Sequence, residues 1–111
     1  MKVLVVEDSE PLGRMLTQTL TRAKHAADWA ATGAAALDSA ARVGPDVVLV
    51  DLHLTDMAGV ELVDQLRATH PAARLIGMSG EVPGVDVVQQ FDAFLLKPVA
   101  LDALLSAVTE K

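Results

Sequence analysis

The hydrophobic residues of this chain gather in short runs that alternate with longer stretches of regularly spaced apolar positions. Four runs are almost purely apolar and rich in Val, Leu and Ile: residues 3–6, 47–52, 75–78 and 93–96. Runs this short and this apolar predict β-strands that are covered on both faces of a sheet. A weaker run at residues 28–31 predicts one further strand after the first.

The stretches between these runs have the spacing of helices. Leu12, Leu16 and Leu20 recur every fourth residue, which places them on one face of a helix that Ser9 can cap. Similar patterns predict helices over residues 32–43, 60–69 and 101–108. A Val-Pro-Gly segment follows the fourth apolar run and leaves room for a helix only at residues 85–90. The fourth helix is therefore predicted to be short or irregular.

This alternation of strand and helix occurs about five times and is typical of a parallel α/β sheet with right-handed crossovers. At 111 residues the chain is long enough for one domain and too short for two, since a domain takes roughly 100–200 residues. We therefore expect residues 1–111 to form one α/β domain with helices on both faces of the sheet.

Charge and composition narrow the possible functions. The chain has 15 acidic and 9 basic residues, a net charge of −6, which argues against direct binding of nucleic acid or of an anionic membrane. It contains no cysteine, so thiolate metal sites and cysteine nucleophiles are excluded. No apolar run approaches the roughly 18 residues of a membrane span. We expect a soluble, cytoplasmic protein.

Polar residues directly follow four of the predicted strands. Glu7 and Asp8 follow the first, Asp51 lies near the end of the third, and Ser79 and Lys97 follow the last two. Any one of them alone is most often a turn or cap residue, but the carboxyl ends of parallel strands share one edge, where ligands bind. Three carboxylates there need a cation, and oxygen ligands favour Mg²⁺. With an ammonium and a hydroxyl nearby, such a site suits a phosphoryl group and a carboxylate nucleophile.

The chain resembles the receiver domain of two-component response regulators. The matching segments are residues 3–8, residues 48–52, Gly59, Ser79 and the pair Lys97 and Pro98. The resemblance runs from Lys2 to the final helix, and the spaced set is specific where no single member is. It implies a flavodoxin-like, doubly wound sheet of five parallel strands in the order 2-1-3-4-5.

The resemblance also implies roles for the acidic residues. Asp51 resembles the phosphoacceptor of the family. Glu7 and Asp8 resemble the acidic pair that holds Mg²⁺, with Asp51 and the backbone carbonyl of His53 as further ligands. The expected donor of the phosphoryl group is a histidine kinase, a phosphotransfer protein or a small phosphodonor.

Three further residues resemble the parts of the family that respond to phosphorylation. Ser79 resembles the hydroxyl that moves toward the phosphoryl group, and Lys97 resembles the lysine that pairs with it. The peptide bond between Lys97 and Pro98 is then expected to be cis. Phe94 resembles the aromatic residue that swings inward when the hydroxyl moves, and a downstream protein partner is expected to detect the change.

Several positions depart from the pattern of the family. Thr55 stands where proline is common after the phosphoacceptor, and Gly80 replaces the more usual alanine after the switch hydroxyl. His53 and Glu81 occupy positions that border the path of the attacking water, so we expect them to tune the lifetime of the acyl phosphate. The interval from residue 79 to 94 is shorter than usual, which puts the common dimer of the family in question.

The same residues also allow other functions. A phosphorylation-independent pseudo-receiver stays open, as does the choice between a stand-alone receiver and part of a longer protein. A Mg²⁺-dependent phosphohydrolase with Asp51 as nucleophile is less favoured, because His53 stands where hydrolases of the haloacid-dehalogenase type carry a second aspartate. A nucleotide-binding module is disfavoured because residues 7–10 read Glu-Asp-Ser-Glu where a glycine-rich phosphate loop is needed.

Overall fold

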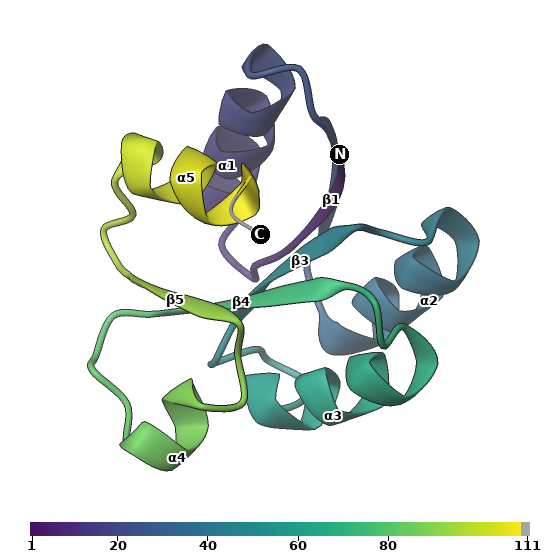
Figure 1. The fold of residues 1–111 in the computed structure, drawn as a ribbon, viewed down its shortest axis with the longest axis vertical. Coiled ribbons are helices and arrows are strands. Elements are labelled where there is room, and N and C mark those ends of the chain that lie inside the picture. Colours follow the sequence, from purple (N-terminus) through teal and green to yellow (C-terminus); the bar gives the residue numbers. More distant parts are fainter. Residues whose placement is uncertain (110–111) are drawn as a thin grey trace.

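The computed structural model describes residues 1–109 and consists of five parallel strands and five helices in strict alternation (Figure 1). The strands are β1 (Lys2–Val6), β2 (Ala26–Ala30), β3 (Val47–Asp51), β4 (Arg74–Ser79) and β5 (Ala93–Leu96). The helices are α1 (Glu10–Arg22), α2 (Gly33–Val43), α3 (Gly59–Thr69), α4 (Val85–Val88) and α5 (Leu101–Thr109). The strands follow one another across the sheet in the order β2-β1-β3-β4-β5, which confirms the predicted fold.

Helices cover both faces of the sheet. Figure 1 shows α1 and α5 together on one side and α2 and α3 on the other. Successive residues of one strand therefore enter different cores: Val5 packs with the cluster that includes Leu16 and Leu104, whereas Val6 packs with the cluster that includes Leu62. This double coverage explains why the central strands read as continuous apolar runs and do not alternate with polar residues.

Two boundaries differ from the sequence prediction. Strand β2 begins at Ala26, two residues before the predicted start, because its backbone pairs with β1 from Lys2↔Ala26 onward. Side-chain patterning does not report such pairing in an alanine-rich edge strand. Helix α4 ends at Val88, earlier than predicted, because α3 and β4 hold the residues that follow: Arg67 donates to the carbonyl of Gln90 at 2.9 Å, and Asp92 accepts from the amide of Leu75 at 2.8 Å.

Gly59 allows α3 to begin directly against the end of β3. A Cβ atom at this position would lie 2.7 Å from the carbonyl oxygen of Asp51 and 2.8 Å from the Cα of Leu52. The amide of Gly59 also donates to the carbonyl of Leu52 at 2.9 Å, so the close approach is part of the hydrogen-bonded turn. The lack of a side chain here therefore sets the distance between α3 and the end of β3.

We expect Gly59→Ala to destabilise the protein by about 1–3 kcal/mol, the usual cost of forcing extra atoms into a packed region. The free energy of unfolding in urea measures this change. Gly80→Ala is the matched control, because a Cβ atom there would meet no atom within 4 Å and its stability should stay near that of the wild type. Equal stabilities for the two variants would contradict the prediction.

Candidate functional site

Polar side chains collect where the strands end at their carboxyl edge. Glu7 follows β1, while Asp51 and Ser79 are the last residues of β3 and β4. Within residues 1–109 these three are the buried polar or charged residues, with exposed fractions of 0%, 3% and 2%. Burying polar groups at one point of an otherwise apolar interior costs stability unless hydrogen bonds, ion pairs or a bound cation compensate for it.

Three of the residues form an acidic cluster. Glu7, Asp8 and Asp51 each offer a carboxylate oxygen, and these atoms lie within 4.8 Å of one another. Glu7 and Asp51 are buried, whereas Asp8 is exposed, so the cluster is open to solvent on the side of Asp8. The predicted convergence of the three acids is therefore confirmed, and this donor set fits a hard divalent cation.

Lys97 is the cation that faces this cluster. Its Nζ lies 2.7 Å from Oε1 of Glu7 and donates a hydrogen bond to Oδ2 of Asp51 at 3.1 Å. The backbone amide of Lys97 donates to the carbonyl of Ser79 at 2.8 Å, so the pairing of β4 with β5 fixes its position. The peptide bond to Pro98 is cis, as the resemblance implied.

The charges in the cluster are only partly balanced. Three carboxylates face one ammonium, and Oε1 of Glu7 has the ion pair with Lys97 but accepts no hydrogen bond from the described residues. Burial raises the pKa of Glu7 from 4.5 to about 7, and the carboxyls of Asp8 and Asp51 raise it too, while the contact with Lys97 lowers it. A bound divalent cation would remove this cost by stabilising the ionised form.

The pKa of Lys97 is shifted by opposing causes. Burial lowers it, but the contacts and charges of Glu7 and Asp51 outweigh burial, so the pKa of Lys97 lies above its ordinary value. The raised pKa of Glu7 has the opposite effect on Lys97: a protonated Glu7 carries no charge and would raise the pKa of Lys97 less. The geometry supports a charged Lys97, because Nζ lies within 3.1 Å of oxygens from two acidic side chains.

The side chains of Asp51 and Ser79 also hold the loops that follow their strands. Oδ1 of Asp51 accepts a hydrogen bond from the amide of His53 at 3.1 Å, and Oγ of Ser79 accepts from the amide of Glu81 at 3.1 Å. The side chains of His53 and Glu81 are exposed near this edge. The structure thus places both residues beside the site, and their effect on the acyl phosphate stays a prediction.

Phe94 packs against the sheet on the side of α3. It pairs in register with Gly77 of β4, where an added Cβ would lie 2.5 Å from the ring of Phe94. Phe91 meets the ring edge-on, with centroids 5.7 Å apart and planes at 73°. The aromatic ring therefore packs, partly buried, over a glycine, and its predicted inward swing on phosphorylation stays a prediction.

Asp56 was missed by the sequence analysis. Its two carboxylate oxygens accept hydrogen bonds from the amides of Gly33 and Ala34 at 2.8 and 2.9 Å, so the loop after β3 is tied to the first turn of α2. These hydrogen bonds lower the pKa of Asp56 below its ordinary value. The partners are more than twenty residues apart in the chain, and no local motif announces such a contact.

We expect Asp56→Ala to lower the melting temperature by a few degrees at neutral pH, because it removes a cap and an anchor of the loop. The folded pKa of Asp56 lies below 3.8, so its contribution is complete above that pH and is lost as the pH falls through the folded value. Melting curves from pH 7 down to pH 3 should show the difference from wild type closing. Asp64→Ala, an exposed acid on α3, is the control and should leave the melting temperature unchanged.

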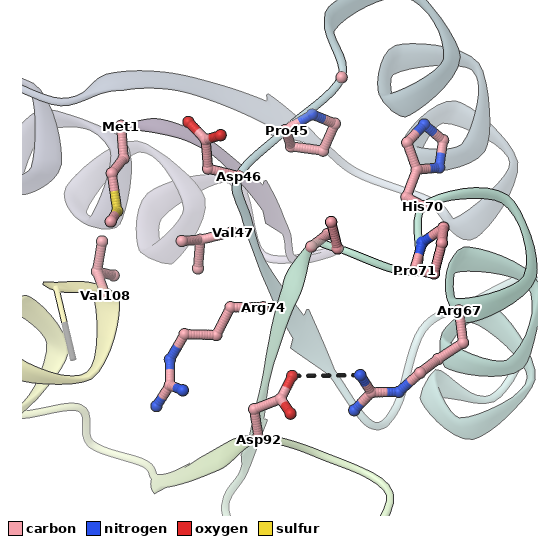
Figure 2. Close-up of a pocket in the computed structure, with 13 residues that line it drawn as sticks. Met1, Pro45, Asp46, Val47, Arg67, His70, Pro71, Arg74, Asp92 and Val108 are labelled. Carbon is pink, nitrogen blue, oxygen red and sulfur yellow. Dashed lines mark hydrogen bonds and ion pairs between the residues drawn. The ribbon is translucent and has the colours of Figure 1, made fainter. Parts of the chain in front are cut away.

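A hollow of about 810 Å³ lies at the opposite edge of the sheet, at the amino ends of the strands (Figure 2). Charged groups that line it already have partners: Arg67 pairs with Asp92 at 3.3 Å, and Asp46 accepts from the amide of Lys2 at 2.8 Å. Figure 2 shows the Arg67–Asp92 pair across one side of the hollow. None of the residues of the acidic cluster lines it.

Comparison with known proteins settles the family. The profile of the response regulator receiver domain matches residues 3–109. The chain belongs to the response regulator receiver family. Within residues 1–109 no helix is long and apolar enough to cross a membrane.

The curated relatives that this chain matches are longer proteins than the chain itself. The chain is 36% identical over 108 residues to the transcriptional regulatory protein KdpE of Mycobacterium tuberculosis, covering 94% of this chain and 47% of that protein. It is also 36% identical over 115 residues to the sensor histidine kinase AtsR of Burkholderia thailandensis, covering 96% of this chain and 19% of that protein. The chain thus spans about half the length of the first relative and a fifth of the second.

Solved structures share the whole fold. A CheY-like receiver domain protein from Methanospirillum hungatei superposes with a TM-score of 0.92 at 26% identity, covering 98% of this chain and 90% of that chain. A response regulator from Burkholderia pseudomallei, solved with a phosphorylated aspartic acid, a calcium ion and citrate, gives a TM-score of 0.88 at 27% identity, covering 98% of this chain and 66% of that chain. The receiver fold of this chain is thus shared by its structural neighbours.

Proposed function

We propose that residues 1–111 act as a phosphorylation-switched receiver domain that accepts a phosphoryl group on Asp51 from a histidine kinase or phosphotransfer protein. The observation that carries this proposal is the position of Asp51, which lies at the end of the central strand, in contact with the Lys97 ammonium and close to the acids Glu7 and Asp8. The Burkholderia pseudomallei relative supports it, because that protein was solved with a phosphorylated aspartic acid and a calcium ion.

Mg²⁺ is the proposed cation. The residues that would hold it are Glu7, Asp8 and Asp51, with the backbone carbonyl of His53, and the donor set consists only of oxygen atoms. When bound, the ion neutralises charge on the oxygens of the incoming phosphoryl group. Asp8 gives the cluster its exposed side, which is the direction from which a cation and a phosphodonor can arrive.

The chain's own residues then perform the transfer. A carboxylate oxygen of Asp51 attacks phosphorus, the bond from phosphorus to the donor breaks, and the donor leaves with that electron pair. For a phosphohistidine donor the leaving group is the imidazole, and the product on Asp51 is an acyl phosphate. Lys97 balances the negative charge that gathers on the phosphoryl oxygens, as a positioned cation does in other phosphoryl transfers.

Switching follows from competition for two side chains. Oγ of Ser79 now accepts from the Glu81 amide, and Lys97 contacts Glu7 and Asp51. The phosphoryl group offers both of them a more highly charged partner, which favours any conformation in which Ser79 donates to it. Movement of Phe94 would carry the change to a downstream protein partner. His53 and Glu81 are proposed to set how quickly water removes the phosphoryl group, and a cytoplasmic location stays a prediction.

Intact mass tests the proposal. After incubation with Mg²⁺ and a small acyl phosphate donor, the protein should gain the mass of one phosphoryl group, and a chelator should abolish the gain. Hydroxylamine should remove the added mass, because it cleaves acyl phosphates and leaves phosphate esters intact. If neither the small donor nor a phosphorylated phosphotransfer protein adds mass, the proposal is wrong, and the phosphorylation-independent pseudo-receiver is the better description. Sustained release of phosphate from phosphate esters would instead favour the phosphohydrolase.

A further inference from the structure

Trp29, the chain's single tryptophan, makes a contact that its place on an edge strand does not require. It lies partly buried on β2, and its indole Nε1 donates a hydrogen bond to the backbone carbonyl of Glu7 at 2.7 Å. A partly buried indole on a sheet edge can direct its N–H to water. Here the N–H is instead directed at the main chain of the acidic cluster.

The peptide unit that receives this hydrogen bond joins two of the three acids. The carbonyl of Glu7 and the amide of Asp8 belong to one planar group, so holding the carbonyl also fixes the start of Asp8. On its other side, the amide of Glu7 donates to the carbonyl of Ala30 at 3.0 Å. Strand β2 therefore holds Glu7 at both its amide and its carbonyl, and the indole supplies the second of these contacts.

Gly13 makes room for the indole. A Cβ atom on Gly13 would lie 2.4 Å from Nε1 of Trp29 and within 2.8 Å of two further atoms of the ring. Helix α1 begins right after the acidic pair, and the amide of Gly13 donates to the carbonyl of its cap residue Ser9 at 2.8 Å. The glycine thus lets the ring pass over the first turns of α1 and reach Glu7.

From these contacts we infer that Trp29 is a positioning residue for the metal site: its indole N–H orients the Glu7–Asp8 peptide so that both carboxylates face the cation. The inference rests on the proposed Mg²⁺-dependent function. Partners outside the ligand set typically change metal affinity by about 10–100-fold. Trp29 acts on the backbone of the ligands and not on a ligand atom, so we expect an effect at the lower end of that range.

Calorimetric titration with Mg²⁺ tests the inference without using phosphorylation. Trp29→Phe keeps an aromatic ring on β2 but removes the N–H donor, and it should weaken Mg²⁺ binding about tenfold. Gly13→Ala keeps the indole N–H donor but displaces the ring, so it should also weaken Mg²⁺ binding. If Trp29→Phe binds Mg²⁺ within twofold of the wild type, the inference is wrong.

A third variant separates positioning from simple loss of stability. Val108→Ala opens space in the buried face of α5, beside the hollow at the far edge of the sheet, which none of the residues of the acidic cluster lines. It should lower the melting temperature without weakening Mg²⁺ binding, whereas an equal loss of affinity in Val108→Ala would overturn the positioning role. A wild-type protein that binds no Mg²⁺ would overturn the metal site itself, and with it this inference. That result is distinguishable, because the wild type alone reveals it.

Discussion

Asp51→Asn will gain no phosphoryl group from a small phosphodonor or from a phosphorylated donor protein. An amide cannot form the acyl phosphate. The His53 amide and Lys97 bond to different oxygens of Asp51, so the single oxygen of asparagine can keep only one of these two hydrogen bonds. The variant also removes one of three neighbouring negative charges, which offsets the lost ion pair with Lys97, so its folded state should be about as stable as that of the wild type. Intact mass measures the first effect and urea unfolding the second.

The matched control for this experiment is Asp64→Asn. Asp64 is exposed on α3. Its replacement by asparagine makes the same change of charge away from the cluster, so this variant should be phosphorylated as fully as the wild type. Mass gained by Asp51→Asn would assign the acceptor to another residue. Peptide mapping of that product would then show whether Asp8 or Glu7 takes its place.

The second large effect is expected for Lys97→Met, which keeps the length of the side chain and removes its charge. The rate of phosphorylation from a small donor should fall by a factor of about 10²–10³, the usual loss when one positioned charge that stabilises a transferring group is removed. The first-order rate of mass gain at saturating Mg²⁺ measures it. Lys97→Arg, which keeps the charge, should retain more of the rate than the methionine variant.

The same substitution should also destabilise the protein in the absence of Mg²⁺. Losing the ammonium leaves the buried Glu7 and Asp51 without their cation, and breaking a charged contact of this kind costs about 2–3 kcal/mol. Added Mg²⁺ should therefore stabilise Lys97→Met more than it stabilises the wild type. Denaturant unfolding of both proteins, with and without Mg²⁺, measures this difference.

The loss of stability in Lys97→Met should depend on pH in a definite direction. Glu7 already has a folded pKa of about 7, above its ordinary 4.5, and losing Lys97 raises that pKa further because the contact with Lys97 lowers it. An acid with a raised folded pKa contributes stability that is complete below its unfolded pKa and is lost as the pH rises through the folded one. The deficit of Lys97→Met should therefore be smaller near pH 5 than near pH 8. A deficit that is the same at both values would contradict the assigned role of Lys97.

The spacing of apolar residues predicts much of the fold. Apolar runs such as residues 47–52, which only Asp51 interrupts, predict buried parallel strands, and a parallel sheet brings the residues after its strands to one edge. The meeting of Glu7, Asp51 and Lys97 follows from these two steps, without any knowledge of side-chain conformations. The strand order came from the resemblance to receiver domains, because spacing alone does not order the strands of a sheet.

The features that escaped prediction depend on contacts between distant segments. Asp56 meets the first turn of α2, and Trp29 meets Glu7, at separations of more than twenty residues. Aspartate in a loop and tryptophan on a strand are ordinary residues in those places, so neither has a local pattern that indicates its partner. The bounds of β2 escaped for the same reason, because they are set by the register with β1 and not by the side chains of β2 itself.

The ion pair between Lys97 and Glu7 also connects two distant strands of the sheet. Lys97 follows β5 and Glu7 follows β1, and these strands are three spacings apart in the sheet, about 14 Å at the usual separation. Strand β5 is only four residues long and has a single neighbour, so it is the element of the sheet with the fewest backbone bonds to break. The long side chain of Lys97 thus links the centre of the sheet to the edge strand that has the fewest backbone hydrogen bonds. Because Lys97 also contacts Asp51, we expect a change of charge at Asp51 to alter this link between the centre and the edge of the sheet.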